Sequence, residues 1–148
     1  MKNFRNLEHY GNRIQSKNYI EIRERVRYSE TDQMGVAHNK SYFEWFEVGR
    51  TAYCDHKNIP YSKIEALGYY LVVVEAHCNY KKPLRYDEPF LIRVTLEQIS
   101  PRKALFSYTI FKEDGKTLAA SGYTVHVVTD RKAKVCSLPQ HIVEKIAS

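Results

Sequence analysis

One segment with helical periodicity, lying between stretches that alternate like strands, constrains the fold of this chain most. From Asn39 to about Cys54, apolar side chains recur at spacings of three and four residues, which predicts an amphipathic helix. Gly49 belongs to the apolar face although glycine costs about 1 kcal/mol in a helix interior, which indicates close approach to another backbone. The whole face consists of Tyr42, Trp45, Phe46, Gly49, Ala52 and Tyr53.

Strand-like patterns surround this helix. Residues 19–28 alternate apolar and charged side chains, which predicts a half-buried strand before the helix. Asn58 would cap a short helix that ends at Gly68, and Leu138-Pro139 leads into another short helix. Glu113-Asp114-Gly115-Lys116 is a strong hairpin signal. The later strands are expected at about residues 70–80, 90–97, 104–111 and 117–129.

This order of elements predicts an α+β fold. One sheet and one long amphipathic helix bury their apolar sides together only if the helix covers a face of the sheet. We therefore expect an antiparallel five-stranded sheet wrapped around a long central helix, formed by a single domain of residues 19–148 after an N-terminal arm of residues 1–18. The outer face of the sheet keeps apolar side chains, which predicts a second copy or another layer over it. These are Leu91, Leu105, Phe111, Val125 and Val127.

Composition excludes several classes of protein. The formal net charge is +6, but no run of five or more basic residues and no nucleic-acid-binding motif is present, so no nucleic acid is expected as a partner. No apolar run approaches the roughly 18–20 residues of a membrane span. The N-terminus has no apolar signal segment, which favours a cytoplasmic protein. The three cysteines are widely spaced, so we expect free thiols and no metal site.

The residues around the start of the predicted helix resemble a known family. The pattern is Thr31-Asp32-x-x-Gly35-x-x-x-Asn39-x-x-Tyr42-x-x-Trp45-x-Glu47-x-x-Arg50. A later segment, Tyr80-Lys-Lys-Pro83-Leu-Arg-Tyr86-Asp87-Glu, resembles a strand-turn-strand element of the same family, with its proline and its aromatic residue before an acidic one. Over about residues 19–140 the chain resembles the hotdog-fold acyl-CoA thioesterases, nearest to the 4-hydroxybenzoyl-CoA thioesterase-like family.

The resemblance implies an assembly and a substrate. Proteins of this kind form dimers whose sheets join edge to edge, and often dimers of dimers, so we expect a homo-oligomer and favour a homotetramer. Their active sites lie at the dimer interface, with the thioester directed toward the N-terminus of the central helix. The substrate would be an acyl-CoA, acyl carrier protein is a further candidate partner, and no cofactor is expected because coenzyme A is part of the substrate.

Asp32 is the candidate catalytic carboxylate. It matches the family's aspartate, which either attacks the thioester carbonyl to form a mixed anhydride or activates a water molecule. The sequence leaves both routes open. Taken alone, an aspartate in a turn more often bonds its own backbone.

The predicted site includes three further residues, Gly35, His38 and Asn39. Gly35 would allow a tight path from the carboxylate to the helix. At the family position of Asn39, the backbone N–H polarises the thioester oxygen, whereas an asparagine at a helix start is also a common N-cap. His38 precedes the position at which relatives linked to the Tol–Pal system carry histidine, so its part in acid–base chemistry is open.

Basic and paired residues extend this hypothesis. Arg102 and Lys103 match the family's basic turn near the nucleotide of coenzyme A, and Lys82 and Arg85 are weaker candidates for the same phosphates. On the helix, Glu47 and the arginine three residues later are expected to form an ion pair.

The leading hypothesis is an acyl-CoA thioesterase that releases a carboxylic acid and free coenzyme A. The first alternative is a non-catalytic hotdog module that binds acyl-CoA or acyl carrier protein, and Asp32 argues against it because a pure binder does not need a carboxylate beside an anionic ligand. A hotdog dehydratase would need a suitably placed Asp/His pair, which we do not find. A nucleic-acid binder is supported by net charge alone.

Overall fold

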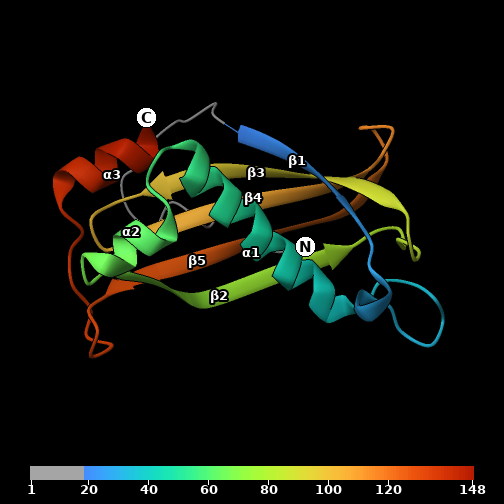
Figure 1. Ribbon diagram of the computed structural model, residues 1–148, viewed down its shortest axis with the longest axis horizontal. Helices are drawn as coiled ribbons and strands as arrows, with labels where there is room; N and C mark the ends of the chain where they lie inside the picture. Colours follow the sequence, from blue (N-terminus) through green and yellow to red (C-terminus); the bar gives the residue numbers. More distant parts are fainter. Residues whose placement is uncertain (1–18) are drawn as a thin grey trace.

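The computed structural model describes residues 19–148, and the predicted N-terminal arm lies outside this part of the chain. Five antiparallel strands form one sheet in the spatial order β1-β3-β4-β5-β2. The strands are β1 (Tyr19–Arg25), β2 (Tyr70–Tyr80), β3 (Pro89–Ile99), β4 (Lys103–Lys112) and β5 (Leu118–Thr129). The helices are α1 (Asn39–His56), α2 (Tyr61–Ala66) and α3 (Gln140–Ala147). Helix α1 lies across one face of the sheet, as predicted, while α2 and α3 lie at one end (Figure 1).

Helix α1 packs on the sheet through its predicted apolar face. Tyr42, Trp45, Phe46, Gly49 and Tyr53 are all buried. A Cβ added at Gly49 would lie 3.2 Å from Ile92 Cγ2 and 3.6 Å from Val94 Cβ, so glycine lets the helix approach β3 closely. The close neighbours are therefore side chains of the sheet and not the backbone that the sequence led us to expect.

The ring of Phe46 fixes the helix over the middle of the sheet. It stacks on Tyr108 of β4 with ring centroids 4.3 Å apart and an interplanar angle of 9°. It also covers Gly122 of β5, where an added Cβ would lie 2.7 Å from the ring and 2.2 Å from the carbonyl oxygen of His77. Such distances are shorter than real Cβ contacts, so no larger residue fits at position 122 without a shift of the strand or the ring.

A chain of buried polar groups continues from Tyr108 across β5. The hydroxyls of Tyr108 and Thr124 share a hydrogen bond at 2.6 Å, and Thr124 Oγ1 lies 2.8 Å from Nε2 of His126. The other ring nitrogen of His126 lies 3.3 Å from the carbonyl oxygen of Leu71. Burial, followed by the charge of Arg50, lowers the pKa of His126 to about 4, so the folded protein holds this ring neutral at neutral pH.

Two predicted element boundaries are wrong. The first strand ends at Arg25 rather than residue 28, because the Glu30 carboxylate accepts the Arg27 N–H at 2.7 Å and turns the chain into a short 3-10 helix, Tyr28–Glu30. Asn58 does not cap α2, since its φ of 59° is left-handed and Pro60 occupies the N-cap. The predicted end at Gly68 agrees with the structure, in which Leu67 is the C-cap of α2.

Strand β2 is an edge of the sheet and is irregular. Its pairing with β5 shifts register between Val73 and Glu75, which interrupts the alternation predicted for residues 70–80. Val72, Val73 and Val74 are exposed along this edge. Unpaired edge strands are templates for pairing with another chain, which agrees with an edge-to-edge dimer. The dimer, and the homotetramer built from it, stay predictions.

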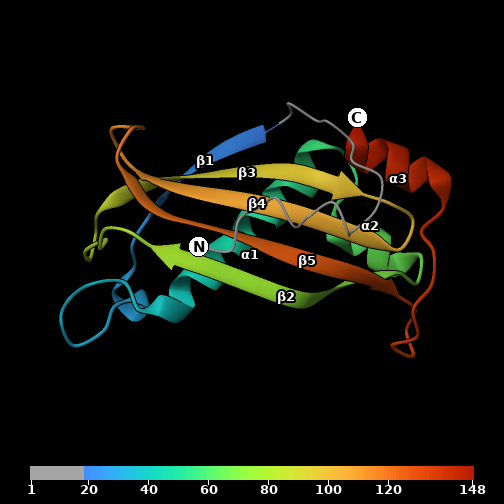
Figure 2. The same ribbon diagram turned by 180° about the vertical axis from the view of Figure 1, so that it is seen from behind.

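The face of the sheet away from α1, seen in Figure 2, also carries buried apolar side chains. Leu105, Tyr123 and Val125 form a cluster separate from the main core. Elsewhere on the sheet, the Arg93 guanidinium lies 5.0 Å from the centroid of the Phe111 ring. Leu105 and Val125 were expected to be covered, and both are buried, whereas a second copy over this face stays a prediction.

Other features of the described chain concern its chemistry. All three cysteines are free thiols. Within residues 19–148, no three His, Cys, Asp or Glu side chains are grouped so that they could hold a metal ion. None of the helices in the same range has the length and apolar character that a membrane crossing requires.

We predict that Gly122→Ala destabilises the protein by about 2–3 kcal/mol, because the added methyl overlaps both the Phe46 ring and the β2 backbone. The free energy of unfolding in urea measures this loss. Ser121→Ala, on the opposite face of the same strand, is the control and should change stability by no more than about 0.5 kcal/mol. Equal stability of the two variants would contradict the packing of α1 described above.

A second prediction concerns acid stability. The folded protein keeps His126 neutral down to a pKa of about 4, whereas the unfolded chain takes up a proton below about pH 6.5. Stability is therefore lost as the pH falls from about 6.5 toward 4, by about 3 kcal/mol from this residue. In urea titrations across this range, His126→Gln should flatten the pH dependence, and the exposed His141→Gln should leave it unchanged. A wild-type slope retained in His126→Gln would exclude this origin.

Candidate active site

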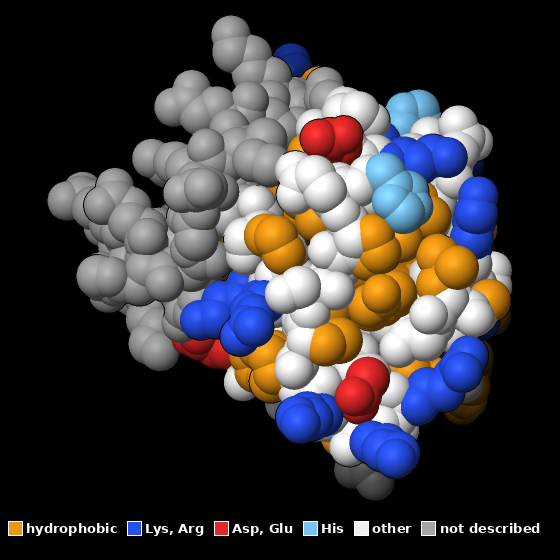
Figure 3. Space-filling model, turned by 90° about the vertical axis from the view of Figure 1, so that its left-hand side faces the viewer, with side chains coloured by type: hydrophobic (Ala, Val, Ile, Leu, Met, Phe, Trp, Pro, Cys, Tyr) orange, Lys and Arg blue, Asp and Glu red, His pale blue; other side chains and the backbone are white. Residues whose placement is uncertain are grey.

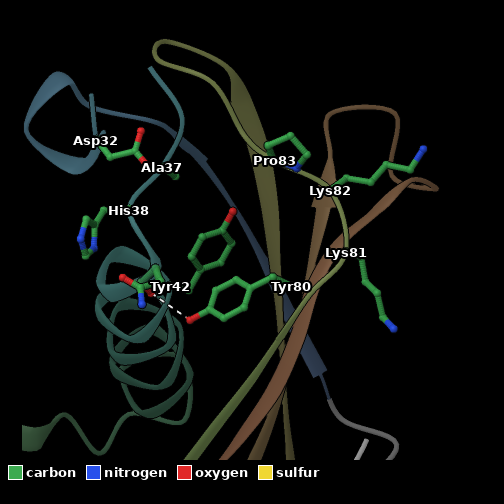
Figure 4. A pocket seen from close by; sticks show the side chains of 9 residues that line it. Asp32, Ala37, His38, Tyr42, Tyr80, Lys81, Lys82 and Pro83 are labelled. Carbon is green, nitrogen blue, oxygen red and sulfur yellow. Dashed lines mark hydrogen bonds between the residues drawn. The ribbon is translucent and has the colours of Figure 1, made fainter. Parts of the chain in front are cut away.

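The candidate active site is a cavity of about 400 Å³ at the start of α1. The loop before the helix forms one wall, and the end of β2 with the residues that follow it forms the other (Figure 4). Four of the predicted site residues thus meet at one cavity: Asp32, His38, Asn39 and Lys82. Its remaining lining residues are Ala37, Tyr42, Tyr80, Lys81 and Pro83.

Asp32 lies in a tight turn that its own carboxylate stabilises. Its Oδ1 accepts the N–H of Met34 at 2.8 Å and, more weakly, that of Val36 at 3.4 Å. Its other carboxylate oxygen has no hydrogen-bond partner among residues 19–148, and it is therefore available to a ligand in the cavity. The turn role and the chemical role, which the sequence left as alternatives, are compatible because they use different oxygens.

The loop that carries Asp32 is held on both sides. Gly35 has a φ of 76° and no atom within 4 Å of an added Cβ, so its conformation, and not lack of space, requires glycine. Its carbonyl oxygen accepts the N–H of Tyr86 at 3.2 Å, and the N–H of Ala37 donates to the carbonyl of Leu84 at 2.7 Å. The segment between β2 and β3 thereby fixes the loop against the sheet.

The first helical residue offers a backbone donor to the cavity. His38 is the N-cap, and its Nδ1 accepts the N–H of Lys40 at 3.1 Å, so the alternative of Asn39 as a side-chain N-cap is wrong. The N–H of His38 donates to the carbonyl of Glu30 at 2.7 Å. The Asn39 N–H has no acceptor among residues 19–148. This amide lies at the positive end of the helix dipole, where it can bind a carbonyl oxygen that becomes negative.

Glu30 joins this loop to the core, a role that the sequence analysis missed. Its carboxylate accepts the indole N–H of Trp45 at 2.7 Å, while its carbonyl accepts both the His38 N–H at 2.7 Å and the Ser41 hydroxyl at 3.0 Å. Trp45 in turn packs on Phe90 of β3, with ring centroids 4.3 Å apart. The position of the helix start therefore depends on contacts with the buried core.

Tyr80 is a second residue that the sequence analysis missed. Its hydroxyl donates to the carbonyl oxygen of Asn39 at 3.1 Å, which fastens the end of β2 to the first residue of α1. Its ring meets that of Tyr42 edge to face, with centroids 4.9 Å apart. Partial burial, followed by the neighbouring Cys78 thiol, raises the pKa of Tyr80 to about 12, so the hydroxyl keeps its proton as a donor.

The predicted phosphate-binding residues do not all lie at this cavity. Lys82 lines it, together with its neighbour Lys81. Arg85 pairs through its backbone with Val36 of the loop, beside the cavity but outside its lining. Arg102 and Lys103 lie where β4 begins, at the opposite end of the sheet (Figure 1). Within one chain they are remote from Asp32, and their role in binding coenzyme A stays a prediction.

The predicted ion pair between Glu47 and Arg50 is absent from residues 19–148. Both residues line a second cavity of about 340 Å³, but the half-buried Arg50 lies beside the hydroxyls of Tyr61 and Tyr108. Burial raises the pKa of both tyrosines, and the arginine charge opposes this rise. Arg50 therefore lies against buried polar groups under α1 and does not pair with Glu47 on the helix surface.

Comparison with known proteins places the chain in a family. Residues 26–146 match the family model described as the thioesterase-like superfamily. A protein of Aquifex aeolicus, named provisionally as an esterase, is 38% identical over 82% of this chain and 93% of its own length. YneP of Bacillus subtilis, named provisionally as an acyl-CoA thioesterase, is 36% identical over 73% of this chain and 78% of its own.

A solved structure agrees with these matches. The DHNA-CoA thioesterase of Staphylococcus aureus is 32% identical and superimposes with a TM-score of 0.77. The similarity covers 81% of this chain and 80% of that one. Both sequence and fold thus point to the same group of proteins.

The cap at His38 leads to a prediction about stability. Replacement of His38 by alanine removes the acceptor for the Lys40 N–H and should cost about 1 kcal/mol of unfolding free energy, whereas His38→Asn supplies a new cap and should restore most of it. Thermal or urea unfolding of both variants measures the difference. If alanine and asparagine are equally destabilising, the imidazole has a role beyond the cap.

Proposed function

The chain belongs to the thioesterase-like superfamily and has its hotdog fold, and from this premise we propose that it hydrolyses an acyl-CoA thioester to a carboxylic acid and free coenzyme A. The resemblance drawn from the sequence is thereby confirmed at the level of family and fold. Membership of this family supports thioester hydrolysis. The acyl-CoA substrate and the roles of individual residues are what we propose.

One observation carries the proposal. Asp32 and Asn39 line the same cavity, and a carboxylate oxygen of the first and the backbone N–H of the second have no hydrogen-bond partner among residues 19–148. Hydrolysis of a thioester requires both kinds of group. A carboxylate attacks the carbonyl carbon or activates water, and an N–H binds the oxygen that gains negative charge. Removal of one such oxyanion donor typically costs about 2.7–4 kcal/mol of transition-state stabilisation.

Two routes are consistent with this arrangement. In the first, the free oxygen of Asp32 attacks the carbonyl carbon, the C–S bond breaks, coenzyme A leaves as thiolate, and water then hydrolyses the mixed anhydride. In the second, Asp32 accepts a proton from a water molecule as that water attacks the carbonyl carbon directly, and the C–S bond then breaks to release the acid and coenzyme A. In both routes the Asn39 N–H donates to the oxyanion, and the helix dipole stabilises its charge.

The cavity also suits the charged part of the substrate. Coenzyme A carries phosphate groups, and Lys81 and Lys82, which follow β2, line the cavity with their side chains directed outward from Asp32 (Figure 4). Tyr42 and Tyr80 supply aromatic surface to the same cavity, which favours an acyl group with apolar or aromatic contact area. We propose that Arg85 adds charge near the same opening, while Arg102 and Lys103 could contribute only from another chain.

The proposal predicts that Asp32→Asn lowers kcat for acyl-CoA hydrolysis by about 10²- to 10⁴-fold, because asparagine keeps the turn but neither attacks nor accepts a proton. Release of free thiol from short, long and aromatic acyl-CoAs measures the rate.

Asp130 offers a matched control, since its Oδ1 accepts the N–H groups of Lys132 at 2.8 Å and Lys134 at 3.0 Å in a similar turn, although it lines none of the described cavities. Asp130→Asn should retain the wild-type rate. Equal rates for Asp32→Asn and wild type would exclude the catalytic assignment, and absence of turnover by wild type on every acyl group would favour a non-catalytic binding module.

A further inference from the structure

Three connections meet at the end of the molecule opposite the Asp32 cavity. They are the end of α2, the turn between β3 and β4, and the loop between β5 and α3. Hydrogen bonds join them, from Arg131 to the carbonyl of Ala66 at 3.3 Å and from Arg102 to the Ser137 hydroxyl at 3.2 Å. We call residues 63–67, 100–102 and 130–137 the distal surface, which these bonds make continuous.

The distal surface is strongly basic. Its two carboxylates are Glu65 and Asp130, and Asp130 is already bonded to backbone N–H groups of its own loop. None of its cationic side chains forms an ion pair with a residue in the range 19–148. These cations are Lys63, Arg102, Arg131, Lys132 and Lys134, all of them exposed. A large part of the chain's formal net charge of +6 is thus concentrated here.

Apolar side chains are exposed among these charges. Leu67 is 53% exposed and Val135 is 51% exposed, although both belong to residue types that are usually buried. Figure 3 views this end of the molecule and shows hydrophobic side chains near the middle of the face, with Lys and Arg toward its margin. The combination of an apolar centre and a cationic margin is typical of surfaces that bind at a lipid–water interface.

The charges are arranged for an extended anion and not for a small one. A single phosphate is bound by donors that converge on a concavity. The cations of the distal surface instead come from separate connections, and none of them lines a cavity described above. A planar array of negative charges would match them better than one coenzyme A phosphate does.

We propose that the distal surface binds the surface of a bilayer that contains anionic phospholipids. The five cations would lie against the headgroups, and Leu67 and Val135 would enter the interfacial layer. Within one chain, an acidic acyl carrier protein fits the charge of this surface but not its position. β4 runs ten residues from the distal surface toward the other end of the sheet, about 30 Å at about 3.3 Å per residue, so a carrier bound there could not present its thioester to Asp32 of the same chain.

Co-sedimentation of the full chain with vesicles tests the proposal. The wild type should bind vesicles of phosphatidylcholine mixed with phosphatidylglycerol, fail to bind pure phosphatidylcholine, and dissociate at high salt. Lys132→Gln/Lys134→Gln should lower the partition coefficient about thirtyfold, since two cations are removed from the headgroup region. Leu67→Ser/Val135→Ser should weaken binding at every salt concentration.

The matched control removes the same charge elsewhere. Lys40→Gln/Lys116→Gln changes two exposed lysines outside the distal surface and should leave vesicle binding close to wild type. Thermal unfolding establishes that each variant is folded. Failure of the wild type to bind anionic vesicles would overturn the proposal, as would an equal loss in both lysine variants. Binding of acyl carrier protein that depends on Lys132 and Lys134, without vesicle binding, would assign the surface to an acidic protein instead.

Discussion

The close approach of α1 to the sheet is the constraint on which the rest of the structure depends. A side chain at Gly122 on β5 would collide with its neighbours, one at Gly49 on the helix would crowd Ile92, and Phe46 fills the space between the two layers. This packing sets the height of the helix above the sheet. The Tyr80 hydroxyl can reach the Asn39 carbonyl only because the helix start lies at that height.

The core and the site are connected through Glu30. Its carboxylate binds the buried Trp45, and its carbonyl binds the start of α1, so the loop that presents Asp32 is tied to the same aromatic core that supports the helix. The Asp32 carboxylate itself is exposed, whereas the Trp45 ring to which its loop is tied is buried. A substitution that leaves strain or a cavity near Trp45 would therefore displace the Asp32 loop, although no residue that lines the site has changed.

The sequence was sufficient for the features that depend on local pattern. The helical period of α1 and the succession of strands along the chain follow from neighbouring residues. The spacing of Asp32, Gly35 and Asn39 was likewise visible in the sequence. Glu30 and Tyr80 were missed because their partners lie 15 and 41 residues away in the chain, respectively. The register shift in β2 also depends on a partner strand, and no local pattern specifies it. Arg102 was placed by resemblance alone, and only the topology of β4 shows how far it lies from the cavity.

The two carboxylate oxygens of Asp32 have different surroundings. One oxygen holds the loop through Met34 and Val36, and the other faces the cavity with no partner in the described chain. An enzyme whose reactive group is also structural usually cannot lose one role without the other. Here an amide in place of the carboxylate would keep the loop, the helix start and the ligand cavity. With the role proposed for Asp32, one substitution would therefore turn a hydrolase with this turn into a ligand carrier that keeps its fold.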